Sequence, residues 1–124
     1  DLTRSRGLGD VYKRQDGKLA LITGSPGGSQ IPNINLQLLV NVLDFNLDIG
    51  EATMLPRIHQ DSQEPELLVE KTVNFDTRRL LEVLGHNVEI SDTIGSTQSI
   101  HIVDGVRYGY ADLRRPNAKV SIKK

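Results

Sequence analysis

The residues best suited to chemistry lie in one short loop between an expected strand and an expected helix. Residues 23–29 read Thr-Gly-Ser-Pro-Gly-Gly-Ser, so that Gly27 and Gly28 are adjacent. Two consecutive glycines let the main chain approach a ligand with no Cβ in the way. Their N–H groups can form an anion-binding nest beside the positive end of a helix. The pair therefore suits a negative oxygen that develops when a carbonyl is attacked.

The same loop also has a reading without chemistry, as a tight strand-to-helix turn, and the pattern alone favours that reading. A phosphate-binding loop is not indicated, because no Gly-Lys-Ser/Thr sequence follows the glycines. Ser25 and Ser29 are not expected to be nucleophiles, since no Gly-x-Ser-x-Gly elbow surrounds them.

The elements around the loop follow a mixed order. Residues 19–23 form an apolar run of strand length, and a helix is expected from Pro32, where proline is tolerated. The apolar face of this helix is broad, so we expect it to be buried on most sides and to stop at Asn46. Asp48 and Glu51 have the spacing of a capping box for a short helix that ends before Pro56.

The second half of the chain adds one helix and several strands. A helix is predicted over 77–84 with Asp76 as its cap and Gly85 as its stop, and short strands are predicted over 67–69 and 88–90. Strands over 98–103 and 106–111, joined by Asp104-Gly105, form the clearest hairpin. This order suits an α+β fold better than a parallel α/β sheet.

Composition limits the function further. The chain has 124 residues, a formal net charge of −1 and no cysteine, which suits one domain or part of one. Balanced charge gives no footprint for nucleic acid, and no apolar run is long enough for a membrane span. His59, His86 and His101 lack metal-type spacing, so no metal is expected.

The two ends of the chain differ from the rest. Residues 1–15 have almost no periodic apolar pattern, and residues 10–15 correspond to the translation of a common sequencing-library transposon end. We therefore expect residues 1–15 to be a non-native or disordered lead-in without regular structure. Residues 16–114 would form the folded part, and residues 115–124 a basic, frayed tail.

The surroundings of the glycine loop give it a more specific meaning. The loop is followed in order by Leu36-Gln37, Asn41-Val42-Leu43-Asp44-Phe45, Pro56-Arg57-Ile58-His59, Val69-Glu70, Gly95-Ser96-Thr97-Gln98 and Asp112-Leu113-Arg114. Across residues 16–114 this series resembles the C-terminal part of the small subunit of γ-glutamyltransferases, the γ-glutamyltranspeptidase or glutathione hydrolase family.

The resemblance implies a partial layered αββα fold of the N-terminal-nucleophile hydrolases. In this family a precursor cleaves itself and exposes a threonine, which attacks the γ-glutamyl amide of glutathione or a related compound. Water, or an acceptor amino acid or peptide, then resolves the γ-glutamyl-enzyme. The family's oxyanion-binding glycines map onto Gly27 and Gly28. No metal or organic cofactor is implied, and bacterial members are usually periplasmic or secreted.

The resemblance also implies that several parts of the enzyme lie outside this chain. The family's nucleophile opens a Thr-Thr-His-type motif well upstream of the glycine loop, and these residues contain no such motif. Thr23 is expected inside or just after a strand, so it is not that nucleophile. The chain would need the large subunit and the rest of the small subunit of the same precursor, and alone it would be inactive. The export signal would also lie outside it.

Five further residues are expected to support the fold rather than to react: Pro26, Arg57, His59, Asp112 and Arg114. We interpret His59 as a hydrogen-bonded structural residue. Asp112 and Arg114 are expected to form an ion pair that closes the last strand.

Two other functions are consistent with the sequence. One is a related acylase that removes β-lactam side chains on the same scaffold. The other is a non-catalytic α+β module that binds a small anion at Gly27 and Gly28. A Thr-Thr-His motif in frame upstream would favour the enzyme, and a start codon just before Asp16 would favour the module.

Overall fold

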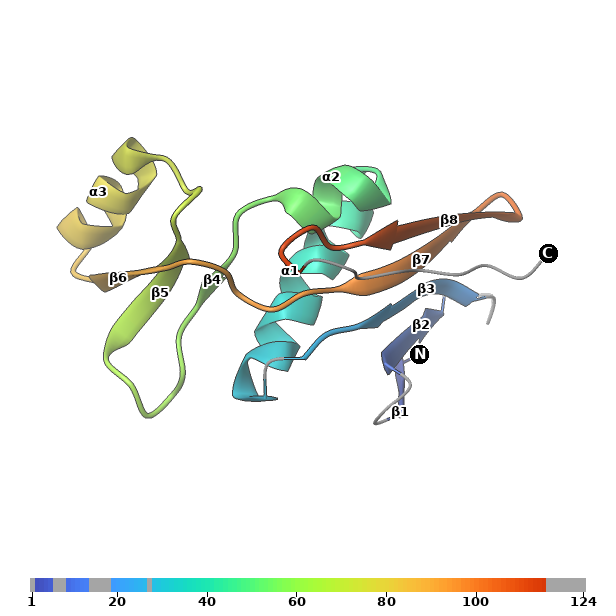
Figure 1. Cartoon of the computed structure of the whole chain (residues 1–124), viewed down its shortest axis with the longest axis horizontal. Helices are drawn as coiled ribbons and strands as arrows, with labels where there is room; N and C mark the ends of the chain where they lie inside the picture. Colours follow the sequence, from blue (N-terminus) through green and yellow to red (C-terminus); the bar gives the residue numbers. More distant parts are fainter. Residues whose placement is uncertain (1, 6–8, 14–18, 27, 116–124) are drawn as a thin grey trace.

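A computed structural model of the chain has the mixed α+β order that the sequence predicts (Figure 1). The structure describes residues 2–5, 9–13, 19–26 and 28–115. The strands are β1 (Leu2–Ser5), β2 (Gly9–Lys13), β3 (Leu19–Gly24), β4 (Ile58–His59), β5 (Glu66–Glu70), β6 (Asn87–Ser91), β7 (Gln98–Val103) and β8 (Val106–Ala111). The helical elements are the 3-10 turn η1 (Gly28–Gln30) and the α-helices α1 (Ile31–Leu43), α2 (Ile49–Met54) and α3 (Phe75–Val83).

The strands form two sheets. The larger has five antiparallel strands in the order β1-β2-β3-β7-β8, and Gly24 at the end of β3 pairs with Gln98 at the start of β7. The smaller has the order β4-β5-β6, with β5 and β6 parallel and joined through α3. Figure 1 shows the smaller sheet and α3 at one end of the molecule and the larger sheet at the other.

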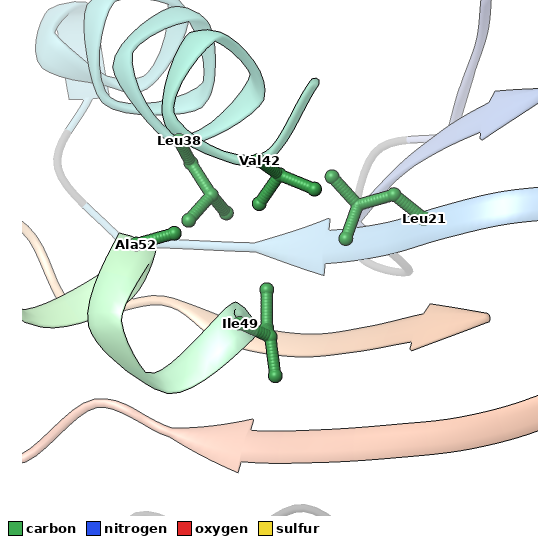
Figure 2. Close-up of a cluster of buried hydrophobic side chains, with 5 residues drawn as sticks. All are labelled: Leu21, Leu38, Val42, Ile49 and Ala52. Carbon is green, nitrogen blue, oxygen red and sulfur yellow. The ribbon is translucent and has the colours of Figure 1, made fainter. Parts of the chain in front are cut away.

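Helices α1 and α2 cover one face of the larger sheet. The buried side chains that join them are Leu21, Leu38, Val42, Ile49 and Ala52 (Figure 2). Each large aliphatic side chain in such a cluster contributes roughly 1.5–3 kcal/mol by leaving water. This cluster fixes the end of β3 relative to α1, and these two elements flank the glycine loop.

Helix α1 begins near Pro32 as predicted, and Asn46 beyond its end has a φ of 55°. The prediction that the helix is buried on most sides is wrong for the described chain. Leu36 is 57% exposed and Leu43 is 56% exposed, because they lie on a side of the helix that meets neither the sheet and α2 nor β4, which Asn33 and Gln37 contact.

Local signals predicted the hairpin and the cap of α2, whereas the cap of α3 needs a correction and β4 was not predicted. The Asp104-Gly105 hairpin is present, and both residues have the positive φ that its turn requires (50° and 78°). Asp48 caps α2 as predicted by accepting a hydrogen bond from the Glu51 N–H at 2.8 Å. The cap of α3 is Asn74 and not Asp76, because Asn74 Oδ1 accepts from the Thr77 N–H at 2.8 Å.

The expectation that residues 1–15 lack regular structure is wrong for two segments. β1 and β2 form an antiparallel pair, and β2 also pairs with β3. The open edge of β3 offers unpaired backbone donors and acceptors, which can order a segment that has no periodic pattern of its own. That these residues are non-native stays a prediction, and residues 116–124 of the expected tail lie outside the described residues. In the part of the chain described here, no helix is both long and apolar enough to cross a membrane.

Candidate functional site

The glycine loop connects the end of β3 to the turn before α1. Gly28 has a φ of +58°, a conformation that favours glycine. A Cβ built on Gly28 would meet no heavy atom of the described chain within 4 Å, and the residue is exposed. The Gly28 backbone is therefore open to a ligand. Gly27 lies outside the described residues, so the joint action of the two amides stays a prediction.

Hydroxyl groups fix the first half of the loop to a second segment. Thr23 Oγ1 lies 2.8 Å from Ser99 Oγ, where β3 pairs with β7. Ser25 Oγ donates a hydrogen bond to the Pro26 carbonyl at 2.7 Å and accepts one from the Ser96 N–H at 3.1 Å. The loop is thus bound to residues 94–99 before it reaches its glycine pair. Thr23 is buried and lies inside β3, the position that the sequence predicts for it.

Four charged side chains, Arg57, Glu70, Asp112 and Arg114, form what we call the buried charge cluster. Glu70 and Asp112 are each 1% exposed, and Arg57 is 3% exposed. Arg57 Nη1 lies 2.9 Å from Asp112 Oδ2. Arg114 binds Glu70 through Nε (2.7 Å) and Nη2 (2.6 Å), and its Nη1 lies 3.1 Å from Asp112 Oδ1. The predicted pair of Asp112 and Arg114 is present.

The cluster holds the segment that supports the loop. Glu70 accepts hydrogen bonds from the N–H groups of Arg57 (2.7 Å) and Ile94 (2.8 Å). Asp112 accepts from the Thr97 N–H at 3.0 Å, and the Arg57 guanidinium donates to the Ile94 carbonyl at 2.9 Å. Residues 94–97 are therefore held at both ends by buried charges.

The two guanidinium groups also bind the end of α2. The Thr53 carbonyl accepts from Arg57 Nη2 at 2.9 Å and from Arg114 Nη1 at 2.7 Å, and the Leu55 carbonyl accepts from Arg114 Nη2 at 2.9 Å. The last carbonyls of a helix have no partner within the helix. The cluster therefore joins α2 to β5 and to the residues that follow β8.

These contacts keep both carboxylates charged. Burial alone would raise the pKa of Glu70, but hydrogen bonds from Arg114 and from the N–H groups of Ile94 and Arg57 outweigh burial and lower it. For Asp112, burial is likewise outweighed by hydrogen bonds from the Arg114 and Thr97 N–H groups and by the two guanidinium charges, so its pKa is also lowered. Burial lowers the pKa of Arg57. Burial alone would also lower the pKa of Arg114, but the hydrogen bond to Glu70 and the charges of Asp112 and Glu70 outweigh burial and raise it.

His59 lies in β4 and is 3% exposed. Its Nδ1 lies 2.7 Å from Asn33 Nδ2, which fits the expected structural role. Its Nε2 lies 3.0 Å from Asp61 Oδ1 without meeting hydrogen-bond geometry. His101 lies within β7, where burial lowers its pKa. Among the described residues, no three His, Cys, Asp or Glu side chains are placed to hold a metal ion.

The family model described as Gamma-glutamyltranspeptidase matches residues 11–122. The chain belongs to this family. The glutathione hydrolase proenzyme of Escherichia coli strain K12 is 48% identical to the chain over 101 residues, which is 81% of this chain and 17% of the relative. The chain thus spans a small part of the length of its curated relative.

Solved structures agree with this family and with the predicted fold. A Helicobacter pylori γ-glutamyltranspeptidase mutant is 31% identical, with a TM-score of 0.76 over 91% of this chain and 65% of that chain. A cephalosporin acylase from Bacillus halodurans is 26% identical, with a TM-score of 0.73 over 80% of this chain and 19% of that chain. The chain therefore has part of the N-terminal-nucleophile hydrolase fold.

The predicted site residues fall into separate groups. Pro26 and Gly28 lie in the loop, whereas Arg57, Asp112 and Arg114 lie together in the cluster behind it. Glu70 was not predicted as a site residue, although it binds both arginines. The available signal was a carboxylate that ends an apolar strand, since a buried charge requires a partner.

Proposed function

We propose that this chain supplies the oxyanion-binding loop of a γ-glutamyltransferase that hydrolyses or transfers the γ-glutamyl group of glutathione and related amides. The backbone amides of Gly27 and Gly28 would bind the oxyanion. The nucleophile would be an N-terminal threonine upstream of this chain, exposed by self-cleavage of the precursor. The observation that carries the proposal is Gly28, which has a positive φ and open space beside it between β3 and α1.

In the proposed reaction, the threonine oxygen attacks the γ-carbonyl carbon and the carbonyl oxygen gains negative charge. Amides already aimed at that oxygen stabilise the transition state more than the substrate, and removing one such donor typically costs roughly 3–4 kcal/mol. The carbon–nitrogen bond then breaks, the amine leaves with the proton that the threonine hydroxyl has lost, and a γ-glutamyl ester of the enzyme remains. Water, or the amine of an acceptor amino acid or peptide, attacks this ester and releases the threonine.

The proposed partners follow from this division of the site. The large subunit and the rest of the small subunit would supply the nucleophile and the groups that bind the substrate, so the isolated chain would be inactive. We place the whole protein in the periplasm or outside the cell on the family resemblance alone.

The proposal can be tested in a chimera in which residues 16–115 replace the corresponding segment of the E. coli glutathione hydrolase. We expect the chimera to cleave itself and to release 4-nitroaniline from γ-glutamyl-4-nitroanilide. Gly28→Ala should lower kcat by about tenfold or more, a fraction of the effect of losing an oxyanion donor, because the Cβ enters the open space. Gly105→Ala is the matched control, since Gly105 also has a positive φ (+78°) and an open Cβ position, but lies in the distant hairpin.

Three results separate the candidates. A chimera that cleaves itself and keeps full turnover with Gly28→Ala would contradict the role of the loop. A chimera that hydrolyses a cephalosporin side chain faster than the γ-glutamyl anilide would favour the acylase, which the likeness to the Bacillus halodurans enzyme supports. Two results together would favour the anion-binding module. The chimera would neither cleave itself nor turn over substrate, and the full chain would bind inorganic phosphate in a way that depends on Gly28.

A further inference from the structure

The Ser25 hydroxyl group makes two hydrogen bonds, one as an acceptor and one as a donor. The Ser96 N–H can only donate, so Ser25 Oγ accepts that hydrogen bond (3.1 Å). A serine hydroxyl has a single proton, and this proton is directed to the Pro26 carbonyl oxygen at 2.7 Å. Ser25 therefore links a loop carbonyl to a fixed backbone amide in another segment.

The Pro26 carbonyl belongs to the same peptide unit as the N–H of Gly27, a predicted oxyanion donor. The six atoms of a peptide unit lie close to one plane, so a restraint on a carbonyl also restrains the N–H of the following residue. The residue that follows Pro26 is Gly27, the first predicted oxyanion donor. Glycine has wide backbone freedom, so a donor supplied by glycine needs a restraint from outside the loop if it is to be aimed in advance.

The other end of the link is rigid. Ser96 is fully buried, and the Gln98 amide donates to its carbonyl at 3.3 Å and to its Oγ at 3.1 Å. Its neighbours Ile94 and Thr97 donate their N–H groups to the buried charge cluster. Ser25 is thus bound to one of the best-held backbone segments in the described chain.

A glycine makes this approach possible. Gly95 has a φ of +69°, and a Cβ built there would lie 2.9 Å from Ser25 Oγ and would overlap Ile34 Cδ1. Any larger residue would displace the side chains of Ile34 and Ser25 from their present positions. The close contact between Ser25 and Ser96 therefore depends on both the conformation and the size of Gly95.

We infer, building on the proposed function, that Ser25 is a positioning residue for the oxyanion-binding amides, because its hydroxyl ties the Pro26–Gly27 peptide unit to Ser96. Ser25 acts through the Pro26 carbonyl and not on the substrate. Its loss should therefore weaken transition-state stabilisation and leave substrate binding in the ground state almost unchanged.

The test uses the same chimera. Ser25→Ala should lower kcat about tenfold, less than the full loss of an oxyanion donor, with KM within about twofold of the parent. Ser25→Thr keeps the hydroxyl and should restore most of kcat. Ser29→Ala is the matched control, since Ser29 Oγ in the same region donates to Asp61 Oδ2 at 3.4 Å and, among the described residues, not to a loop carbonyl. Thermal unfolding of all four proteins separates positioning from loss of folding.

The inference is overturned if Ser25→Ala keeps the parent kcat, if KM alone changes, or if threonine fails to rescue. A parent chimera without turnover would count against the proposed function instead. In that case amide hydrogen exchange in the full chain tests the role of Ser25, because this measurement does not require an active enzyme. Ser25→Ala should speed exchange at the Ser96 N–H by about fivefold, as expected for one lost hydrogen bond, and Ser29→Ala should not. Equal exchange rates in the two variants would overturn the inference.

Discussion

Glu70 shows how one buried carboxylate can hold several segments together. Its two oxygens accept hydrogen bonds from the Arg114 side chain and from the N–H groups of Arg57 and Ile94. These partners come from the residues after β8, the residues before β4 and the segment that supports the glycine loop. A single substitution at Glu70 should therefore affect all three.

We expect Glu70→Gln to reduce the free energy of unfolding of the full chain by about 3–5 kcal/mol, because two buried arginines would then share one carboxylate. Urea unfolding followed by circular dichroism measures this change. Glu82→Gln is the matched control, since Glu82 is exposed on α3, and its effect should stay within about 0.5 kcal/mol. Similar losses in both variants would contradict the importance of the cluster.

The site was predictable from the sequence only where its partners are close in the chain. Asp112 and Arg114 are near neighbours of opposite charge, and their ion pair was predicted. Glu70 is separated from Arg114 by 44 positions, and no pattern in a single sequence gives that proximity. The role of the glycine pair came from a family resemblance, because a turn without chemistry explains the same residues equally well.

At the scale of elements, prediction succeeded where backbone chemistry is local. The Asp104-Gly105 turn and the Asp48 cap each depend on a few adjacent residues, and both were placed correctly. β4 was missed because it has only two residues, Ile58 and His59, and depends on its pairing with β5. The side chain of Gln37 adds to this pairing, since its amide binds both the N–H and the carbonyl of Ile58 (3.0 and 2.8 Å).

The start of α3 gives a direct comparison between the predicted cap and the observed one. Asn74→Ala should destabilise the chain by about 1 kcal/mol, because the Thr77 N–H loses its acceptor. Asp76→Ala should cost less, about 0.3–0.5 kcal/mol, since Asp76 only interacts with the positive end of the helix. Thermal unfolding of both variants, with Asn74→Asp as the control that keeps a cap, measures the difference. A larger loss for Asp76→Ala would restore the original prediction.

At the scale of the whole molecule, several of the exposed apolar side chains lie on α3 or just beyond it, and these include the most exposed ones. Phe75 and Leu80 are each 64% exposed, and Val83 and Leu84 are each 76% exposed. Exposed apolar patches of this kind mark contact surfaces. Because the chain spans 17% of its E. coli relative, we expect the rest of the proposed enzyme to cover this face. The sequence could not predict the exposure, since an apolar helical face is expected to be buried.

The dependence of stability on pH should report the buried charge cluster. The pKa values of Glu70 and Asp112 are lowered in the folded chain. The unfolded chain, with ordinary values of about 4.3 and 3.9, therefore binds protons at a pH where the native cluster is still charged. Stability from these carboxylates is complete above about pH 5 and is lost as the pH falls through the ordinary values towards the lowered native ones.

Glu70→Gln removes one of these two titrating groups. Its free energy of unfolding in urea should therefore fall less steeply than that of the parent chain between about pH 6 and pH 3.5, because fewer protons are taken up on unfolding. Glu82→Gln serves as the control that removes one exposed carboxylate. Parallel pH profiles for the parent and Glu70→Gln would mean that the native pKa of Glu70 is not lowered. The contacts from Arg114 and Ile94 would then not stabilise the charged form.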